Sequence, residues 1–241
     1  MNQYRKEPVL IERIEHPFNI IKSYEKIEWL NYWLDQANAV NHNNGRRILL
    51  IGDSTSRAYR SELADLYKNP VDYIGVSSIF LDEFCLREIE LFFEFQTEPY
   101  ELIQIQIGCH GIENMPVEWD KGEFYKCYEK QYKKVIDFLQ TRTKKIVLAT
   151  TTPIVRYNPE QKMILKKIYN KLHLYKSEKI DYDYETDITI RNQIVKSLVK
   201  DGIVLNDLYE LMLKHKMKHI DHIHYEKRSN RIIAESILKH L

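Results

Sequence analysis

Apolar and polar positions follow two alternating patterns along most of the chain. Short apolar runs, such as "RILLIG" at 47–52, are followed by longer segments in which apolar residues recur every three or four positions. Such short runs are typical of buried strands, and the longer spacing is typical of helices. The pattern predicts strands at 47–52, 71–78, 100–108 and 144–153, helices at 56–67, 82–95, 125–140, 189–202 and 226–241, and a strand that runs into a further helix at 203–212.

This order of elements favours one class of fold. Strands that alternate with helices build a parallel sheet that is covered by helices on both faces. In such sheets, ligands bind at the carboxyl ends of the strands. We therefore predict an α/β domain over residues 46–241, with any site at the edge where Ser54 follows the first strand.

Two segments fit this alternation less well. Residues 1–45 precede the first strand, and their stretch 23–40 has apolar residues at helical spacing, which predicts a helical N-terminal extension. Residues 157–185 form an insertion rich in Tyr and Lys after the fourth strand, on the ligand side of the sheet. We interpret this insertion as a candidate lid or substrate wall, with a plain surface excursion as the alternative.

Composition narrows the function classes. The chain has 241 residues, of which 44% are apolar, and 36 basic against 35 acidic residues give a net charge of +1. This balance provides no global field to attract nucleic acid, so we expect no nucleic-acid partner. Three widely spaced cysteines indicate a reducing compartment and no zinc knuckle. No apolar run reaches the roughly 18 residues of a membrane span, and we expect a cytoplasmic protein.

The end of the first strand raises a chemical question, because Gly52, Asp53 and Ser54 follow its apolar run directly. One interpretation is a glycine turn followed by a Ser or Thr N-cap. The other is a serine nucleophile, which needs a base and a group to orient that base. The segment "DHIHY" supplies both, because Asp221 can meet one ring nitrogen of His224 while the other nitrogen accepts the proton of Ser54.

Donors for an oxyanion can come from the ends of neighbouring strands. The third strand ends at Gly108, which lets the chain turn, and the imidazole of His110 follows it. The second strand ends in "IGVSS", where the backbone N–H of Ser78, or alternatively of Gly75, can donate. The N–H of Ser54 is a third donor, at a helix start whose dipole favours negative charge.

Together, Gly-Asp-Ser at 52–54 and Asp-x-x-His at 221–224 resemble the SGNH (GDSL) hydrolase superfamily. The similarity extends in order and spacing over residues 46–241. The resemblance implies a three-layer α/β/α fold with a flavodoxin-like parallel sheet. It also implies a Ser-His-Asp triad that acts on esters without a cofactor.

The chain departs from this family at two blocks. The third block is Gly-x-Asn in the family, and here it is Gly-Cys-His at 108–110, which resembles a bacterial branch that has histidine there. The second block usually ends in glycine, and Ser78 stands at that position. By analogy with the family, we expect a serine esterase that removes an acetyl group from a carbohydrate or another small ester.

Three alternatives stay open on the sequence alone. One is a metal site, because His215 and His219 are four residues apart and Asp221, His222 and His224 follow. No Glu stands beside the first of these histidines in the manner of metalloproteases, so we expect no metal. The second is an acyltransferase that uses a sugar hydroxyl in place of water. The third is a non-catalytic binding module with the same fold.

Overall fold

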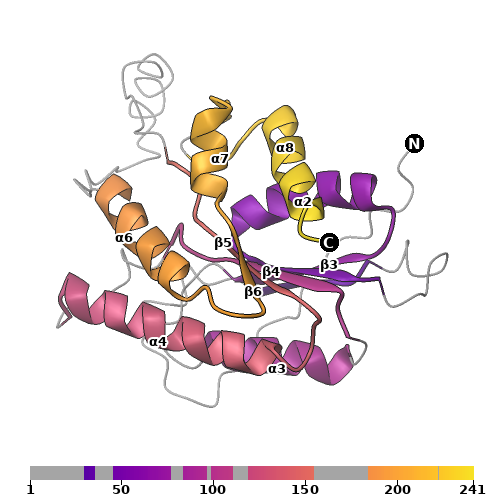
Figure 1. Cartoon of the computed structure of the whole chain (residues 1–241), viewed down its shortest axis with the longest axis horizontal. Helices are drawn as coiled ribbons and strands as arrows, with labels where there is room; N and C mark the ends of the chain where they lie inside the picture. The colour runs from indigo at the N-terminus through magenta and orange to yellow at the C-terminus, as the bar shows by residue number, and fades with distance from the viewer. Residues whose placement is uncertain are drawn as a thin grey trace, which may run out of the picture.

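A six-stranded sheet forms the middle layer of the protein (Figure 1). The structure, a computed structural model, describes residues 30–35, 46–76, 84–96, 99–110, 119–154, 184–221 and 223–241. The strands are β1 (Leu30–Trp33), β2 (Ile48–Gly52), β3 (Val71–Val76), β4 (Leu102–Gln106), β5 (Ile146–Ala149) and β6 (Ile203–Asn206). They lie in the order β1-β3-β2-β4-β5-β6, and all neighbours are parallel except β1 and β3.

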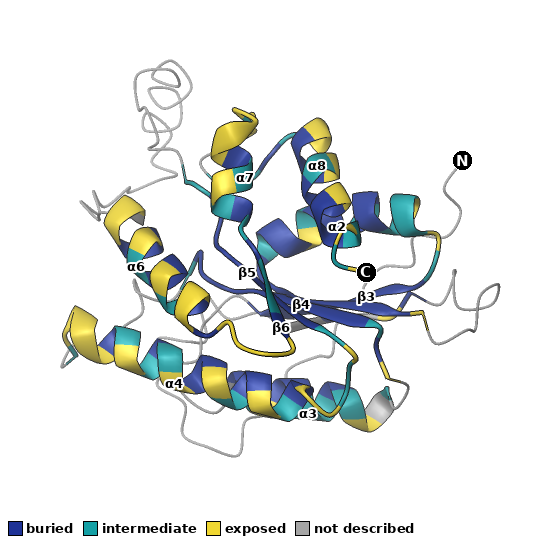
Figure 2. Ribbon diagram, in the orientation of Figure 1, coloured by how far each residue is buried: buried dark blue, intermediate teal, exposed yellow. Residues whose placement is uncertain are grey.

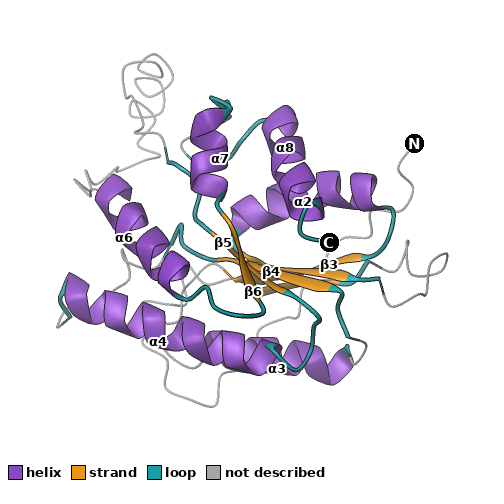
Figure 3. Cartoon of the chain, viewed as in Figure 1, coloured by secondary structure: helices purple, strands orange, loops and turns teal. Residues whose placement is uncertain are grey.

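Helices cover both faces of this sheet (Figures 1 and 3). One face carries α2 (Ser54–Tyr67), α7 (Leu208–Lys214) and α8 (Lys227–Leu238). The other face carries α3 (Phe84–Phe95), α4 (Lys121–Leu139) and α6 (Tyr184–Ser197). The predicted three-layer α/β/α fold with a central parallel sheet is confirmed.

The strand β2 has no polar side chain because it is buried on both faces. In β2, Ile48 and Leu50 pack toward α2 and α8, whereas Leu49 and Ile51 pack toward α3 and α4. All four are fully buried, as the dark sheet between amphipathic helices in Figure 2 shows. Side chains alternate between the faces of a strand, so a strand covered on both sides needs a continuous apolar run. This explains why "RILLIG" shows no polar alternation.

The helix expected within residues 23–40 is wrong where the structure describes this segment. Leu30–Trp33 is a strand that pairs antiparallel with β3, with Leu30 opposite Val76 and Trp33 opposite Tyr73. The edge of β3 offers unpaired backbone groups, and pairing with them outweighs a weak helical spacing. Residues 1–29 and 36–45 of the predicted extension and positions 157–183 of the predicted insertion lie outside the described residues. Positions 184 and 185 of that insertion begin α6.

The connections of the sheet place a topological switch point beside β2. The chain leaves β2 through α2 on one face, and it returns from β3 to β4 through α3 on the other face. β2 and β4 are neighbours, so their carboxyl ends form the switch point at which ligands bind in such sheets. None of the helices in the described residues combines the length and apolar content of a membrane span.

Candidate active site

The turn after β2 is built around Asp53, which is the N-cap of α2. Its buried carboxylate accepts hydrogen bonds from the backbone N–H of Thr55 at 2.9 Å and of Cys109 at 3.3 Å. Gly52 has no room for a side chain, because a Cβ there would collide with Ser56 and with the backbone oxygen of Gln106. The N-cap of α2 is thus Asp53 and not a Ser or Thr, as the simple N-cap interpretation of the sequence has it, and Ser54 is the first residue of the helix.

Ser54, His224 and Asp221 lie together. The Oγ of Ser54 is 2.7 Å from the Nε2 of His224, and the Nδ1 of His224 is 2.7 Å from the Oδ2 of Asp221. With the proton on Nδ1, the ring donates to the carboxylate and accepts from the serine hydroxyl. The side chains of His224 and Asp221 keep exposed fractions of 30% and 39%, so this chain of hydrogen bonds lies at the surface.

The carboxylate of Asp221 is held in its charged form. Its Oδ1 accepts the backbone N–H of Ile223 at 2.8 Å and of His224 at 2.7 Å. Partial burial alone would raise the pKa of Asp221, but the hydrogen bonds from His224 and Ile223 and the nearby imidazole lower that pKa to about 2. The group that faces the histidine is therefore an anion at neutral pH.

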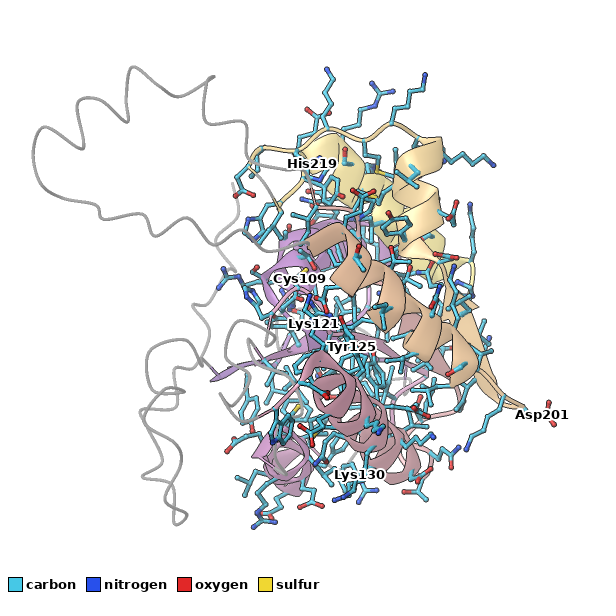
Figure 4. The ribbon with its side chains drawn as sticks, turned by 90° about the vertical axis from the view of Figure 1, so that its left-hand side faces the viewer. Cys109, Lys121, Tyr125, Lys130, Asp201 and His219 are labelled. Atoms are coloured by element: carbon cyan, nitrogen blue, oxygen red, sulfur yellow. The ribbon has the colours of Figure 1, made fainter. Side chains whose placement is uncertain are left out.

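The loop that carries Asp221 and His224 rests on the segment that follows β5. The hydroxyl of Tyr225 donates to the backbone oxygen of Pro153 at 2.7 Å, and the Nε2 of His219 lies 3.1 Å from the same oxygen. The rings of His219 and Tyr225 lie side by side, with centroids 4.0 Å apart. Figure 4 labels His219 on the same side of the molecule as Cys109. The loop is thus fixed to a neighbouring strand end.

The predicted oxyanion donors differ in how the structure places them. Ser54 stands at the start of α2, and His110 follows the end of β4, which is the neighbour of β2. Gly75 lies inside β3, opposite Gly52 on one side and Asn31 on the other, and not at a free strand end. Ser78 lies outside the described residues. The switch point therefore brings the loop of His110 to Asp53, the residue before the serine.

The loop at 108–110 contacts β5 and α2. A Cβ on Gly108 would collide with the Oγ1 of Thr151, so this glycine is what allows the close approach of the loop after β5. The next residue, Cys109, donates its N–H to Asp53. Gly108 and Asp53 therefore shape the candidate site and have no part in the proposed reaction.

Sequence reasoning missed three residues of α6 that hold the site. Arg191 donates to the backbone oxygen of His110 at 2.7 Å and forms an ion pair with Asp187, and both side chains are fully buried. The side chain of Asn192 bonds both the N–H and the C=O of Thr151, at 2.7 and 3.0 Å. The only local signal is an Asp-x-x-x-Arg spacing, which on most helices marks an exposed pair.

The alternative metal site finds no support in the described part of the chain. No group of three His, Cys, Asp or Glu side chains that could hold a metal ion occurs there. The imidazole of His219 is at the backbone of Pro153, and that of His224 lies between Ser54 and Asp221. His222, which the alternative includes, lies outside the described residues.

Comparisons with known proteins give structural matches only. No protein-family model and no curated protein matches the chain. A GDSL-like lipase from Bacteroides thetaiotaomicron matches with a TM-score of 0.55 at 12% identity over 85% of this chain and 93% of that one. An acetyl-xylooligosaccharide esterase from Geobacillus stearothermophilus, solved as a mutant, matches with a TM-score of 0.50 at 14% identity over 81% and 93%. The chain therefore shares the three-layer α/β/α fold of these two hydrolases.

Proposed function

We propose that this protein is a serine esterase of the SGNH type that removes an acetyl group from a carbohydrate. The observation that carries the proposal is the continuous contact from the Oγ of Ser54 through His224 to Asp221, with both steps at 2.7 Å. A serine, a base and an orienting carboxylate in this arrangement are the parts of a nucleophilic triad. The site also lies at the switch point of the sheet, where α/β proteins bind ligands.

In the proposed mechanism, Ser54 attacks the ester carbonyl while its hydroxyl proton moves to the Nε2 of His224. The resulting imidazolium is stabilised by the anion of Asp221, and it returns the proton to the leaving alkoxide as the tetrahedral intermediate collapses. This leaves an acetyl group on Ser54. Water then attacks this acyl-enzyme through the same base, which releases acetate and restores the serine.

The negative oxygen of the tetrahedral intermediate needs donors that are already in place. We assign this role to the backbone N–H of Ser54, to the side chain of His110 and, by the family resemblance, to the N–H of Ser78. The positive end of the α2 dipole favours negative charge at the same point. The placement of the 108–110 loop at the neighbouring strand end supports the role of His110.

The substrate class rests on analogy. The matched esterase is named for acetylated xylo-oligosaccharides, and the matched lipase is named GDSL-like. Ester hydrolysis is therefore the activity that the names of the two matched proteins have in common. The proposal that the substrate is a small carbohydrate acetate is therefore the finer part of this hypothesis. We place the reaction in the cytoplasm because the three cysteines are odd in number and widely spaced.

The test is acetate release from a panel of short-chain and long-chain aryl esters and sugar acetates. We expect turnover of acetyl esters to exceed that of long-chain esters, and Ser54→Ala to abolish it. Adding acceptor sugars should not divert the acetyl group from water. Formation of an acetylated sugar in preference to acetate would assign the protein to the acyltransferases, and the absence of Ser54-dependent turnover on every ester would contradict the proposal.

A further inference from the structure

A fully buried arginine of α6 contacts the loop that follows β4. The Nη1 of Arg191 donates to the backbone oxygen of His110 at 2.7 Å, and its Nη2 pairs with the carboxylate of Asp187 one helical turn earlier. The other oxygen of Asp187 accepts the hydroxyl of Tyr125 from α4 at 2.9 Å. The arginine thus links helices α4 and α6 to a single backbone group.

Stability alone does not explain this ion pair. Removing two charges from water costs several kcal/mol for each ion, and apolar side chains of similar size in the same place are often as stable or more stable. Burial acts to lower the pKa of Arg191, yet the carboxylate of Asp187 raises it above the ordinary value, so the guanidinium stays charged. What the pair adds beyond apolar packing is a fixed, charged donor aimed at the carbonyl of His110.

Each of three consecutive residues in the 108–110 loop is held by a different element. Gly108 packs without a side chain against Thr151 after β5, and Cys109 donates its N–H to the N-cap of α2. His110 gives its backbone oxygen to Arg191 of α6. The first two contacts fix the start of the loop, and the third fixes the backbone of the residue that carries the imidazole.

We infer that Arg191 is a positioning residue that holds the backbone of His110 so that the loop presents its donor to the oxyanion. The inference rests on the proposed function. The oxyanion develops in the transition state and the tetrahedral intermediate and is absent from the bound ester, so a displaced donor lowers kcat and leaves KM almost unchanged. A displacement of about 1 Å in such a site can cost about 10²-fold in rate.

The main variant is the double substitution Asp187→Leu with Arg191→Met, which removes both charges and leaves no lone buried ion. We expect a folded protein with kcat lowered about 10-fold to 10²-fold and KM nearly unchanged. Lys196→Met on the same helix is the matched control, because it removes an ion pair with Asp207 without contacting His110, and it should keep the kcat of the wild type. A wild-type kcat in the double variant would overturn the inference.

Arg191→Lys keeps the positive charge next to Asp187, and so tests the proposal should the double variant fail to fold. The ammonium group lacks the planar fork that reaches both the carboxylate and the carbonyl of His110. We expect the same loss of kcat, and a wild-type kcat in this variant would also overturn the inference. In a His110→Ala background the added loss should vanish, because the two residues act as one unit.

A readout independent of activity separates this inference from the proposed function. Amide hydrogen exchange at Cys109, measured by NMR, should be at least about tenfold faster in the variant with Asp187→Leu and Arg191→Met than in the wild type. Unchanged exchange would overturn the inference even where esterase activity is present. Failure of wild-type turnover on every ester would contradict the proposed function and leave the exchange result standing.

Discussion

At the scale of residues, the site depends on one imidazole between two oxygen atoms. His224 has no choice of orientation, because Asp221 binds its Nδ1 and Ser54 is at its Nε2. Two backbone N–H groups keep the carboxylate in place and, against the effect of partial burial, they and the imidazole of His224 lower its pKa to about 2. A motif of four residues therefore brings the proposed base and the proposed orienter together, and this short spacing is what let the sequence point to the pair.

The first prediction concerns Asp221→Asn. The amide keeps the shape but favours the wrong tautomer of His224, so kcat should fall about 10⁴-fold as in other triads. Glu226→Gln is the matched control, because this nearby carboxylate makes no side-chain cap bond, and it should keep wild-type kcat. Steady-state kinetics on one acetyl ester compares them. Equal kcat values for Asp221→Asn and wild type would contradict the assignment of the orienter.

The lowered pKa of Asp221 also predicts a pH dependence. The folded state favours the carboxylate, so this group contributes stability above its unfolded pKa near 3.9. The contribution is lost as pH falls toward about 2. An acid limb of the activity profile above pH 5 should therefore not belong to this carboxylate. A titration of the Asp221 carboxyl by NMR with a midpoint at or above 4 would contradict this.

The role of His110 can be tested by replacing its imidazole with the asparagine amide that the family pattern has at this position. His110→Ala should lower kcat by about 10²-fold to 10³-fold, the usual cost of one lost oxyanion donor. His110→Asn should restore much of this loss, because an amide can donate from a similar position. The same ester assay measures all three proteins. A wild-type rate in the alanine variant would leave the oxyanion to backbone N–H groups alone.

At the scale of elements, periodicity predicted the parallel strands and the helices between them, because two-sided burial makes most positions of each strand apolar. It failed at Leu30–Trp33, where pairing with β3 decides the structure and no local pattern reports it. It also missed Arg191, since a contact from α6 to the end of β4 joins residues 81 positions apart. Long-range contacts of this kind do not affect the spacing of apolar residues along the sequence, so periodicity cannot predict them.

The close approach of two strand ends gives a prediction at this scale. Gly108→Ala places a methyl group against the Oγ1 of Thr151, and overpacking of this kind costs about 1–3 kcal/mol of unfolding free energy. Thr151→Ala in the same protein removes the colliding oxygen and should recover part of that loss. Denaturant unfolding of the single and double variants measures both. Equal stability of Gly108→Ala and wild type would show that the loops do not need this contact.

At the scale of the whole molecule, the two ends of the parallel strands carry different groups of polar residues. The candidate site lies at the carboxyl ends of the strands. At their amino ends lies a buried ion pair, in which two nitrogens of Arg47 donate to the carboxylate of Asp72. The hydroxyl of Tyr100 and the N–H of Asp35 donate to the same carboxylate at 2.7 and 2.8 Å. This network joins β1, β2 and β3 far from the serine.

Because the two groups of residues lie at opposite ends of the strands, we expect that stability and activity can be changed independently. Arg47→Met leaves the carboxylate of Asp72 without its charged partner, which should cost about 3–5 kcal/mol of unfolding free energy. The kcat per folded molecule should stay at the wild-type value. Thermal unfolding and active-site titration of the same sample measure the two quantities. A large fall in kcat with unchanged stability would show that this end of the strands acts on the site.

The most direct measurement of the central claim is covalent labelling by a fluorophosphonate, followed by mass spectrometry of the modified peptide. An activated serine should react in a ratio of one label to one protein, at Ser54 alone, and Asp221→Asn should slow the labelling strongly. Ser54→Ala should take up no label and have no esterase activity, with an unchanged circular dichroism spectrum. Labelling at another residue, or wild-type turnover in Ser54→Ala, would contradict the account.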